Sequence, residues 1–436
     1  MAWRFLLCAL LVACAALAAT ADSEAKSGAK SAAKNGAPPA CRSADDRAGG
    51  KADAAGDDDA DDEDDDDGDA GGVRFQVAGT CAKVTGGVSY TYQQASQTAS
   101  GLPLFVNSNG TVTSGSFSNT VSANIGLELT RATPVGELKT TVSADWSKAT
   151  GDGTPNGSGK MSGWSAGLSN TLGVLTVGYT GTLMSFWEGD SLTTANAPGR
   201  SASMIVYEYR LDDHNTIAAG LESNLPTTPQ TYVGIQSFNL SDPVYTLRWR
   251  HERDDFTVHL SGVLRRADFS QSPLLPFLPN TATVRTGWGV SAGLKLPVRA
   301  LGEDDEFNTQ WTYTSDAASY LGISTDLTMY QHTVRSLGPT TGWSAVGGYH
   351  HVWSDEFESN AFASFVSLDA NLLLASPRAR SLRTGINLFW KPVDHLKFGI
   401  EFGTVDLRLE PNGVRGIFDG AGGRAYIGVF SVSAEL

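Results

Sequence analysis

Apolar and polar residues alternate along most of the chain from Cys81 onward. Between Val121 and Thr130 the odd positions are Val, Ala, Ile, Leu and Leu, and the even positions are Ser, Asn, Gly, Glu and Thr. A period of two predicts β-strands with one apolar and one water-facing side. The segments 137–146 and 256–265 repeat this pattern. We see no long segment with the 3.6-residue period of a helix.

The pattern predicts sixteen strands separated by turns and loops of two kinds. Tight turns, such as those at 133–135, 354–355 and 392–394, alternate with loops of roughly ten to twenty-five residues, as in bacterial barrels with short periplasmic turns and long external loops. An even strand number with both termini on the periplasmic side lets the sheet close. The predicted strands are 81–93, 119–131, 136–148, 161–170, 173–182, 202–210, 214–223, 243–251, 254–266, 285–297, 304–315, 341–353, 356–368, 381–391, 395–409 and 423–436.

Aromatic residues of the apolar face gather at the strand ends, as two girdles at the membrane surfaces would. One group lies near short turns (Trp249, Trp353 and Trp390), and the other lies beside long loops (Trp146, Trp164, Trp288, Tyr313 and Trp343). Trp343 and Trp353 bracket one strand, and their spacing projects to roughly 25 Å at about 3.3 Å per residue and a tilt near 40°. We therefore predict an all-β transmembrane antiparallel barrel of about sixteen strands over residues 73–436. A soluble sandwich or propeller would not confine its aromatics in this way, and no blade-length repeat is visible.

The first 21 residues have the pattern of a secretory signal peptide. One charge, Arg4, precedes the apolar core Phe5–Leu17, and Ala19-Thr20-Ala21 forms a cleavage site. An alternative is that Leu11–Cys14 is a lipoprotein box, which would make Cys14 a lipidated N-terminus. Both interpretations predict export.

Residues 22–72 form a strongly acidic segment, with sixteen acidic and six basic residues. Its repulsive runs of aspartate and its few apolar side chains predict disorder, and they leave the barrel itself only mildly acidic. Diffuse binding of divalent cations is the alternative. No EF-hand register fits, because counting from Glu63 places Arg74 at position twelve. With the signal removed, Cys41 and Cys81 remain, and an even pair in an oxidising compartment suggests a disulfide.

Several motifs resemble the porins of alphaproteobacteria. Residues 75–88 are similar to that family's opening, in which Gly-Thr-x-Thr-Cys leads into a Lys/Arg-x-x-Gly-Tyr-Val strand, and Cys41 resembles its earlier cysteine. Three further stretches, 247–262, 287–297 and 384–401, match in order. The segment between Cys41 and Cys81 is longer than the family's, and the chain ends in Leu436, whereas most such porins end in phenylalanine.

The resemblance implies a homotrimeric porin in outer-membrane lipid, through which small hydrophilic solutes diffuse passively without a cofactor. Nucleic acid is not an expected partner. It also implies that the third long loop, about 183–201, folds inward and narrows the channel. Glu188 and Asp190 would then present carboxylates to the water path. The mild acidity of the barrel and of this loop predicts a weak preference for cations.

Alternation places further charged side chains on the water-facing side of the wall, where rings or rows of charge sort solutes by sign. A slip of one residue in register would reverse every such assignment. These residues are Arg248, Arg250, His259, Arg265, Arg383 and Glu401.

Two segments, Gly163–Gly167 and Gly289–Gly293, spell the Gly-x-Ser-x-Gly motif of hydrolases. That motif works on a sharp strand-to-helix turn, whereas Ser165 and Ser291 fall inside alternating strands. His350 and His351 have no partners at metal-ligand spacing. We therefore predict neither an enzyme nor a metal site. The alternatives are a barrel with enzymatic or adhesive activity in its loops, and a soluble exported β-protein.

Overall fold

The structure is a computed structural model. It describes residues 72–77, 79–100, 104–107, 110–112, 116–151, 153–193, 195, 197–198, 201–223, 243–268, 284–299, 302–322, 341–369, 378–410 and 422–436. The predicted signal peptide, Cys41 and nearly all of the acidic segment lie outside these residues.

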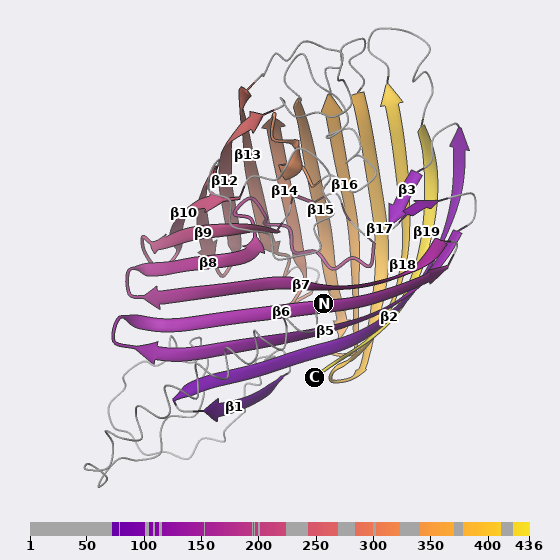
Figure 1. Cartoon of the computed structure of the whole chain (residues 1–436). Helices are drawn as coiled ribbons and strands as arrows, with labels where there is room; N and C mark the ends of the chain where they lie inside the picture. Colours follow the sequence, from indigo (N-terminus) through magenta and orange to yellow (C-terminus); the bar gives the residue numbers. More distant parts are fainter. Residues whose placement is uncertain are drawn as a thin grey trace.

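Sixteen antiparallel strands form a closed barrel (Figure 1). Each strand pairs with the next in the chain, and the last strand, β19, pairs with β2 to close the ring. The predicted fold class is confirmed, and each of the sixteen predicted strands has its counterpart. The strands of the ring are β2 (Thr80–Ser100), β5 (Ser116–Thr133), β6 (Gly136–Gly151), β7 (Gly153–Asn170), β8 (Gly173–Gly181), β9 (Ser201–Arg210), β10 (Asn215–Glu222), β11 (Val244–Arg253), β12 (Phe256–Asp268), β13 (Val284–Pro297), β14 (Glu306–Ser315), β15 (Thr341–Ser354), β16 (Phe357–Asp369), β17 (Arg378–Val393), β18 (Leu396–Glu410) and β19 (Gly422–Glu435).

The two faces of the wall differ as a membrane barrel requires. On β17, Leu382 and Ile386 are 42% and 59% exposed, whereas Arg383 and Asn387 are each 3% exposed. The apolar set therefore faces outward. Because the ring is closed, each of its strands has a hydrogen-bonding neighbour on both sides. The backbone needs these partners, since the hydrocarbon of the membrane offers no hydrogen bonds.

The predicted girdle residues lie at the ends of the outer face. Six of them are exposed, namely Trp146, Trp288, Tyr313, Trp343, Trp353 and Trp390. Trp164 and Trp249 are half-buried. The Trp390 ring stacks on Phe398 with centroids 5.3 Å apart, and the Trp343 ring lies 4.8 Å from that of Phe365.

Four short elements were not predicted. β1 (Val73–Val77) pairs with Thr80–Val84 of β2, beyond the point where β19 ends opposite Gly87. It thus occupies the place beside β2 that β19 has left. The hairpin of β3 (Leu104–Asn107) and β4 (Gly110–Val112) follows β2, and the 3-10 helix η2 (Ala318–Tyr320) follows β14. Among the described residues, no helix has the length and apolar character needed to cross a membrane.

The short turn between β13 and β14 is tied to β15 by a buried carboxylate. Asp305 accepts hydrogen bonds from the Tyr349 hydroxyl, from His351 Nδ1 at 2.7 Å and from the Val352 amide at 3.2 Å. Burial opposes ionisation, but these hydrogen bonds outweigh it and hold the pKa of Asp305 below its ordinary 3.8.

We expect Asp305→Asn to lower the unfolding temperature of the detergent-extracted barrel at pH 7. Because the folded-state pKa is depressed, the ionised carboxylate stabilises the barrel above pH 3.8, and this contribution is lost as the pH falls through the folded-state pKa. The deficit of the variant should therefore shrink in the most acidic buffers. Asp304→Asn, an exposed neighbour in the same turn, is the control and should change little at either pH.

Candidate functional site

The connection between β8 and β9 lies against the inside of the barrel, and we call its continuous described segment, Thr182–Thr193, the inner loop. Its first residues are fixed to β10. Glu222, which is fully buried, accepts hydrogen bonds from Thr182 Oγ1 at 2.5 Å and from the Leu183 amide at 3.3 Å. The Tyr320 hydroxyl of η2 donates to the same carboxylate at 2.8 Å. The loop therefore leaves the wall from a rigid base.

The middle of the inner loop is held by Gln310 of β14. Its side-chain Nε2 donates to the Met184 carbonyl at 2.6 Å, and its Oε1 accepts from the amides of Phe186 and Trp187 at 3.2 and 2.9 Å. The Phe186 ring lies over His259 of β12, with centroids 5.0 Å apart. One fully buried amide thus satisfies three backbone groups that would otherwise lack partners inside the barrel.

Glycines in the wall leave room for the aromatic side chains of the inner loop. A Cβ on Gly293 of β13 would lie 2.1 Å from Phe186 Cδ1, and one on Gly348 of β15 would lie 2.5 Å from Trp187 Cη2. Both positions require glycine, because the Cβ of any other residue would collide with these rings.

We expect Gly348→Ala to displace Trp187 or to strain the wall, at a cost of about 1–3 kcal/mol for overpacking. Gly347→Ala is the matched control, because its Cβ would meet nothing nearer than Thr309 Oγ1 at 3.5 Å. Thermal unfolding, followed by gel mobility of unboiled samples, compares the two variants. Equal stability of both variants would contradict the packing role of Gly348.

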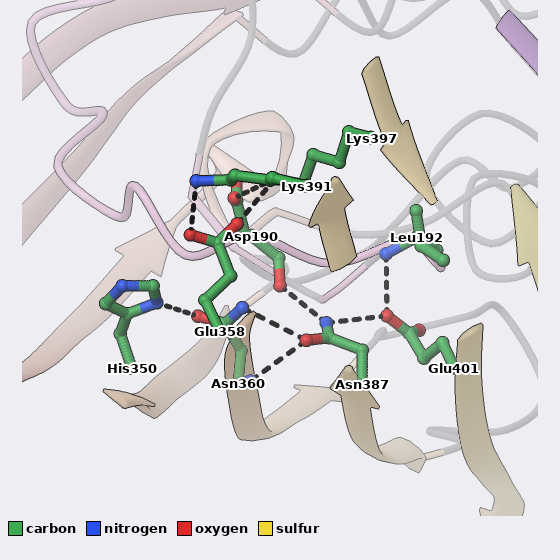
Figure 2. Close-up of polar contacts among 9 residues, drawn as sticks. All are labelled: Asp190, Leu192, His350, Glu358, Asn360, Asn387, Lys391, Lys397 and Glu401. Atoms are coloured by element: carbon green, nitrogen blue, oxygen red, sulfur yellow. Dashed lines mark hydrogen bonds and ion pairs between the residues drawn. The ribbon is translucent and has the colours of Figure 1, made fainter. Parts of the chain in front are cut away.

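The far end of the inner loop is anchored to β17 and β18 (Figure 2). The fully buried Glu401 accepts hydrogen bonds from the amides of Leu192 and Thr193 at 2.6 and 2.9 Å, and from the Thr193 hydroxyl. Asn387 Nδ2 donates to the Asp190 carbonyl at 2.8 Å and to Glu401 at 3.1 Å. The loop thus crosses the inner wall from β10 to β18.

Acidic and basic side chains alternate in two chains of ion pairs that begin on the inner loop. Asp190 pairs with Lys397 at 3.1 Å, and Lys397 also pairs with Glu358 at 2.8 Å (Figure 2). Lys391 approaches the other oxygen of Glu358 at 2.6 Å. Glu188 lies 3.7 Å from Lys295, which in turn pairs with Glu306 at 2.7 Å.

Beside these charges lies a recess of about 240 Å³, lined by the inner loop and by polar side chains of β14–β16. The wall half a turn around the ring, on β6 and β7, carries several hydroxyl groups. There, Thr141 and Ser165 are hydrogen bonded at 2.7 Å, and Ser162 donates to Ser143 at 3.0 Å. A solute passing the inner loop would meet the charges of the loop on one side, and these hydroxyl groups and the Glu128–Lys139 ion pair on the other.

The side chains predicted to line the lumen all point inward, but the inner loop divides them. Glu188 and Asp190 lie on the loop, with side chains 63% and 57% exposed. His259 and Glu401 lie beneath it, 1% and 0% exposed, so neither faces open water. Glu401 instead anchors the loop.

The four predicted arginines lie on the wall. Arg248 pairs with Glu208, and Arg250 pairs with Glu252 at 3.2 Å. Arg265 donates to Ser319 of η2 at 3.4 Å, and Arg383 is 3% exposed. Both of these are therefore largely covered.

Sequence reasoning missed Glu222, Gln310, Asn387, Lys295 and Lys397, although alternation put each in a predicted strand. An uncharged polar or acidic residue among the wet-face positions gives no sign of which backbone it will meet. The full burial of Glu222 marks it as an anchor in the structure. The sequence could not show this burial, because it does not show which inward-facing residues a loop will cover.

The remaining candidates have structural partners. Cys81 is disulfide-bonded, and the other three cysteines lie outside the described residues, so the pairing with Cys41 stays a prediction. Ser291 donates to the Trp311 carbonyl at 3.0 Å and lies within β13, as Ser165 lies within β7. Neither serine is on the strand-to-helix turn that the hydrolase motif requires. Within the described parts of the chain, no group of three or more metal-ligating side chains occurs.

Comparison with known proteins gives one family and many similar folds. The family model described as DcaP outer membrane protein matches residues 85–409. The outer membrane channel DcaP of Acinetobacter baumannii is 15% identical, with 84% of this chain and 99% of that chain covered at a TM-score of 0.64. The trimer form of OmpT from Vibrio cholerae is 12% identical (82% and 99% covered, TM-score 0.52), and OmpF of Salmonella typhi in complex with daunomycin is 10% identical (84% and 100% covered, TM-score 0.50). No curated protein matches the sequence.

Proposed function

Because the chain belongs to the family of DcaP outer membrane proteins, it is a porin of the outer membrane, and we propose that the inner loop forms the narrowest part of its channel. The position of the loop supports this proposal, because it crosses the inside of the barrel and is held at its base, middle and far end. The prediction of an outer-membrane porin is confirmed. The matching family is that of DcaP, and the closer kinship with alphaproteobacterial porins stays a prediction from the motifs alone.

The solutes that we propose are small and hydrophilic, and they pass by diffusion. Sixteen strands give a bore that side chains alone do not fill. At the inner loop, carboxylates are more exposed than their basic partners, since Glu188 and Asp190 are 63% and 57% exposed, against 34% for Lys295 and 29% for Lys397. This difference supports a weak preference for cations.

We further propose a homotrimer without enzymatic activity. OmpT of Vibrio cholerae, one of the similar structures, is described in a trimer form. The hydroxyls of Ser165 and Ser291 take part in hydrogen bonds of the wall, which favours a structural role for both serines.

Single-channel recording of the purified protein in planar bilayers tests the porin function. We expect steps of stable conductance that occur in threes for a trimer, and swelling of protein-containing liposomes that slows as the sugar in the medium grows larger. A protein that inserts into bilayers but conducts no ions would contradict the proposal. Hydrolysis of lipid esters that disappears in Ser165→Ala or Ser291→Ala would favour the enzymatic alternative.

A further inference from the structure

Charged side chains stand on the outer face of the wall at the extracellular ends of β17, β18 and β19. The turn between Val393 and Leu396 is periplasmic, so β18 runs outward from it. Its outward-facing positions are Phe402, Thr404, Asp406 and Arg408, and Arg424 of β19 lies opposite Asp406. Charged groups are costly on the lipid face near the bilayer midplane and are tolerated near its surfaces.

Spacing along β17 places these guanidinium groups at the level of the extracellular aromatic girdle. Arg380 and Trp390 lie ten residues apart on the outer face of β17, the same spacing as between Trp343 and Trp353 on β15, and Arg408 is the partner of Arg380 on β18. Tryptophans of such girdles lie at the level of the lipid headgroups. Arg380 and Arg408 are therefore at headgroup depth.

The two most exposed side chains of this cluster are arginines. Asp406 accepts hydrogen bonds from Arg408 Nε at 2.9 Å and from Arg424 Nη2 at 2.8 Å, but its own side chain is only 17% exposed. Arg408 and Arg424 are 67% and 51% exposed. The carboxylate thus lies behind two guanidinium groups and holds them in place. A third guanidinium, Arg380, lies beside Arg408 and is 38% exposed. Its Nη1 donates at 2.7 Å to Glu410, whose carboxylate is 44% exposed and neutralises part of this charge.

A groove of about 660 Å³ begins next to this cluster and extends toward the membrane midplane on the same outer face. Ile386, Phe402 and Tyr426 line it and are 59%, 67% and 49% exposed. Gly428 forms part of its floor, because a Cβ at that position would meet no atom nearer than Phe402 Cε1 at 3.9 Å. An apolar chain lying in the groove would cover these side chains.

We propose that this outer face binds a phosphorylated lipid of the outer leaflet. Its phosphate lies against Arg380, Arg408 and Arg424, since guanidinium forks match phosphate oxygens. One of its acyl chains runs down the groove over Gly428. Both parts fit in the orientation that a leaflet imposes, with the head at the surface and the chain pointing toward the midplane.

Native mass spectrometry of the purified, folded protein in detergent tests the proposal with diphosphorylated lipid A as the probe. Phosphate-free lipid A and inorganic phosphate are the comparison probes, because they separate the contributions of head and chain. We expect Arg408→Gln/Arg424→Gln to weaken binding of lipid A by roughly tenfold or more, as the loss of charge-assisted hydrogen bonds implies. Gly428→Leu fills the groove and should weaken it independently.

Arg266→Gln and Gly262→Leu are the matched controls, because both residues face outward on β12, away from the groove. Gel mobility of unboiled samples shows that each variant is folded. Equal binding of the phosphate-free lipid, or equal losses in the β12 controls, would overturn the proposal. Dissociation of an oligomer in Gly428→Leu with unchanged binding of lipid A would also overturn it, because the groove would then lie between copies of the chain. Binding of inorganic phosphate alone would show an anion site without a lipid.

Discussion

Replacing Glu401 by glutamine is expected to release the far end of the inner loop and to make the open channel noisy and more conductive. The carboxylate accepts from both amides at Leu192 and Thr193, from the Thr193 hydroxyl and from Asn387. Glutamine has the same shape, but its NH2 group replaces one of the carboxylate oxygens. That group cannot accept these hydrogen bonds and would face their donors. Hydrogen bonds to a charged group contribute about 1.5–3 kcal/mol each. We therefore expect the loss of two or more of them to free this end of the loop. Single-channel traces record the change as current fluctuation and mean conductance.

Glu128→Gln is the control for the loss of one lumen carboxylate. Glu128 lies on β5 across the ring and pairs with Lys139 at 3.0 Å, away from the described part of the inner loop. That variant should keep a quiet trace, because only its local charge changes. Quiet, unaltered conductance in Glu401→Gln would show that the loop is held in place without this anchor.

The wall could be predicted from the sequence because a membrane barrel imposes one rule on every strand. Each position faces either hydrocarbon or the interior, so alternation in segments such as 121–130 sets both the strand and its orientation. The predicted strand 161–170 began late, however, since β7 begins at Gly153. Residues 153–160 are mostly glycine and polar residues, because they lie beyond the alternating part of the strand, while the backbone ladder to β6 continues.

The path of the inner loop could not be predicted in the same way. Its contacts join residues far apart in the chain, such as Phe186 with Gln310 and Leu192 with Glu401. Alternation assigns Glu401 and His259 to the inner face, but it could not show that the loop covers them. Whether an inward charge meets water or backbone depends on a segment that has no periodicity of its own.

The same contacts explain how the inner loop can keep its position while solutes pass it. Its backbone is bound by the side chains of four strands, namely Glu222 of β10, Gln310 of β14, Asn387 of β17 and Glu401 of β18. Its own carboxylates, Glu188 and Asp190, remain the exposed groups. The residues that anchor the loop thus differ from the carboxylates that we propose to set ion selectivity, so the two sets can be changed separately.

Neutralising the exposed carboxylates of the loop should therefore alter ion selectivity while the loop stays anchored. We expect Glu188→Gln/Asp190→Asn to lower the ratio of potassium to chloride permeability by roughly two- to fivefold, as charges a few ångströms from the ion path in water would. Lys295→Gln/Lys397→Gln should raise the ratio. Reversal potentials in salt gradients measure both, and the shifts should be larger in dilute salt, where screening is weaker.

The opposite signs of the two double variants make this test specific to the position of the inner loop. Each of the two carboxylates contacts one of the two lysines. A general disturbance of the loop would therefore move the permeability ratio in the same direction in both double variants. Opposite shifts require ions to pass within about one Debye length of Asp190 and Lys397, roughly 10 Å at 0.1 M salt, because charges farther away are screened. If both variants keep the original selectivity while their conductance is unchanged, the ions pass elsewhere and the inner loop does not form the constriction.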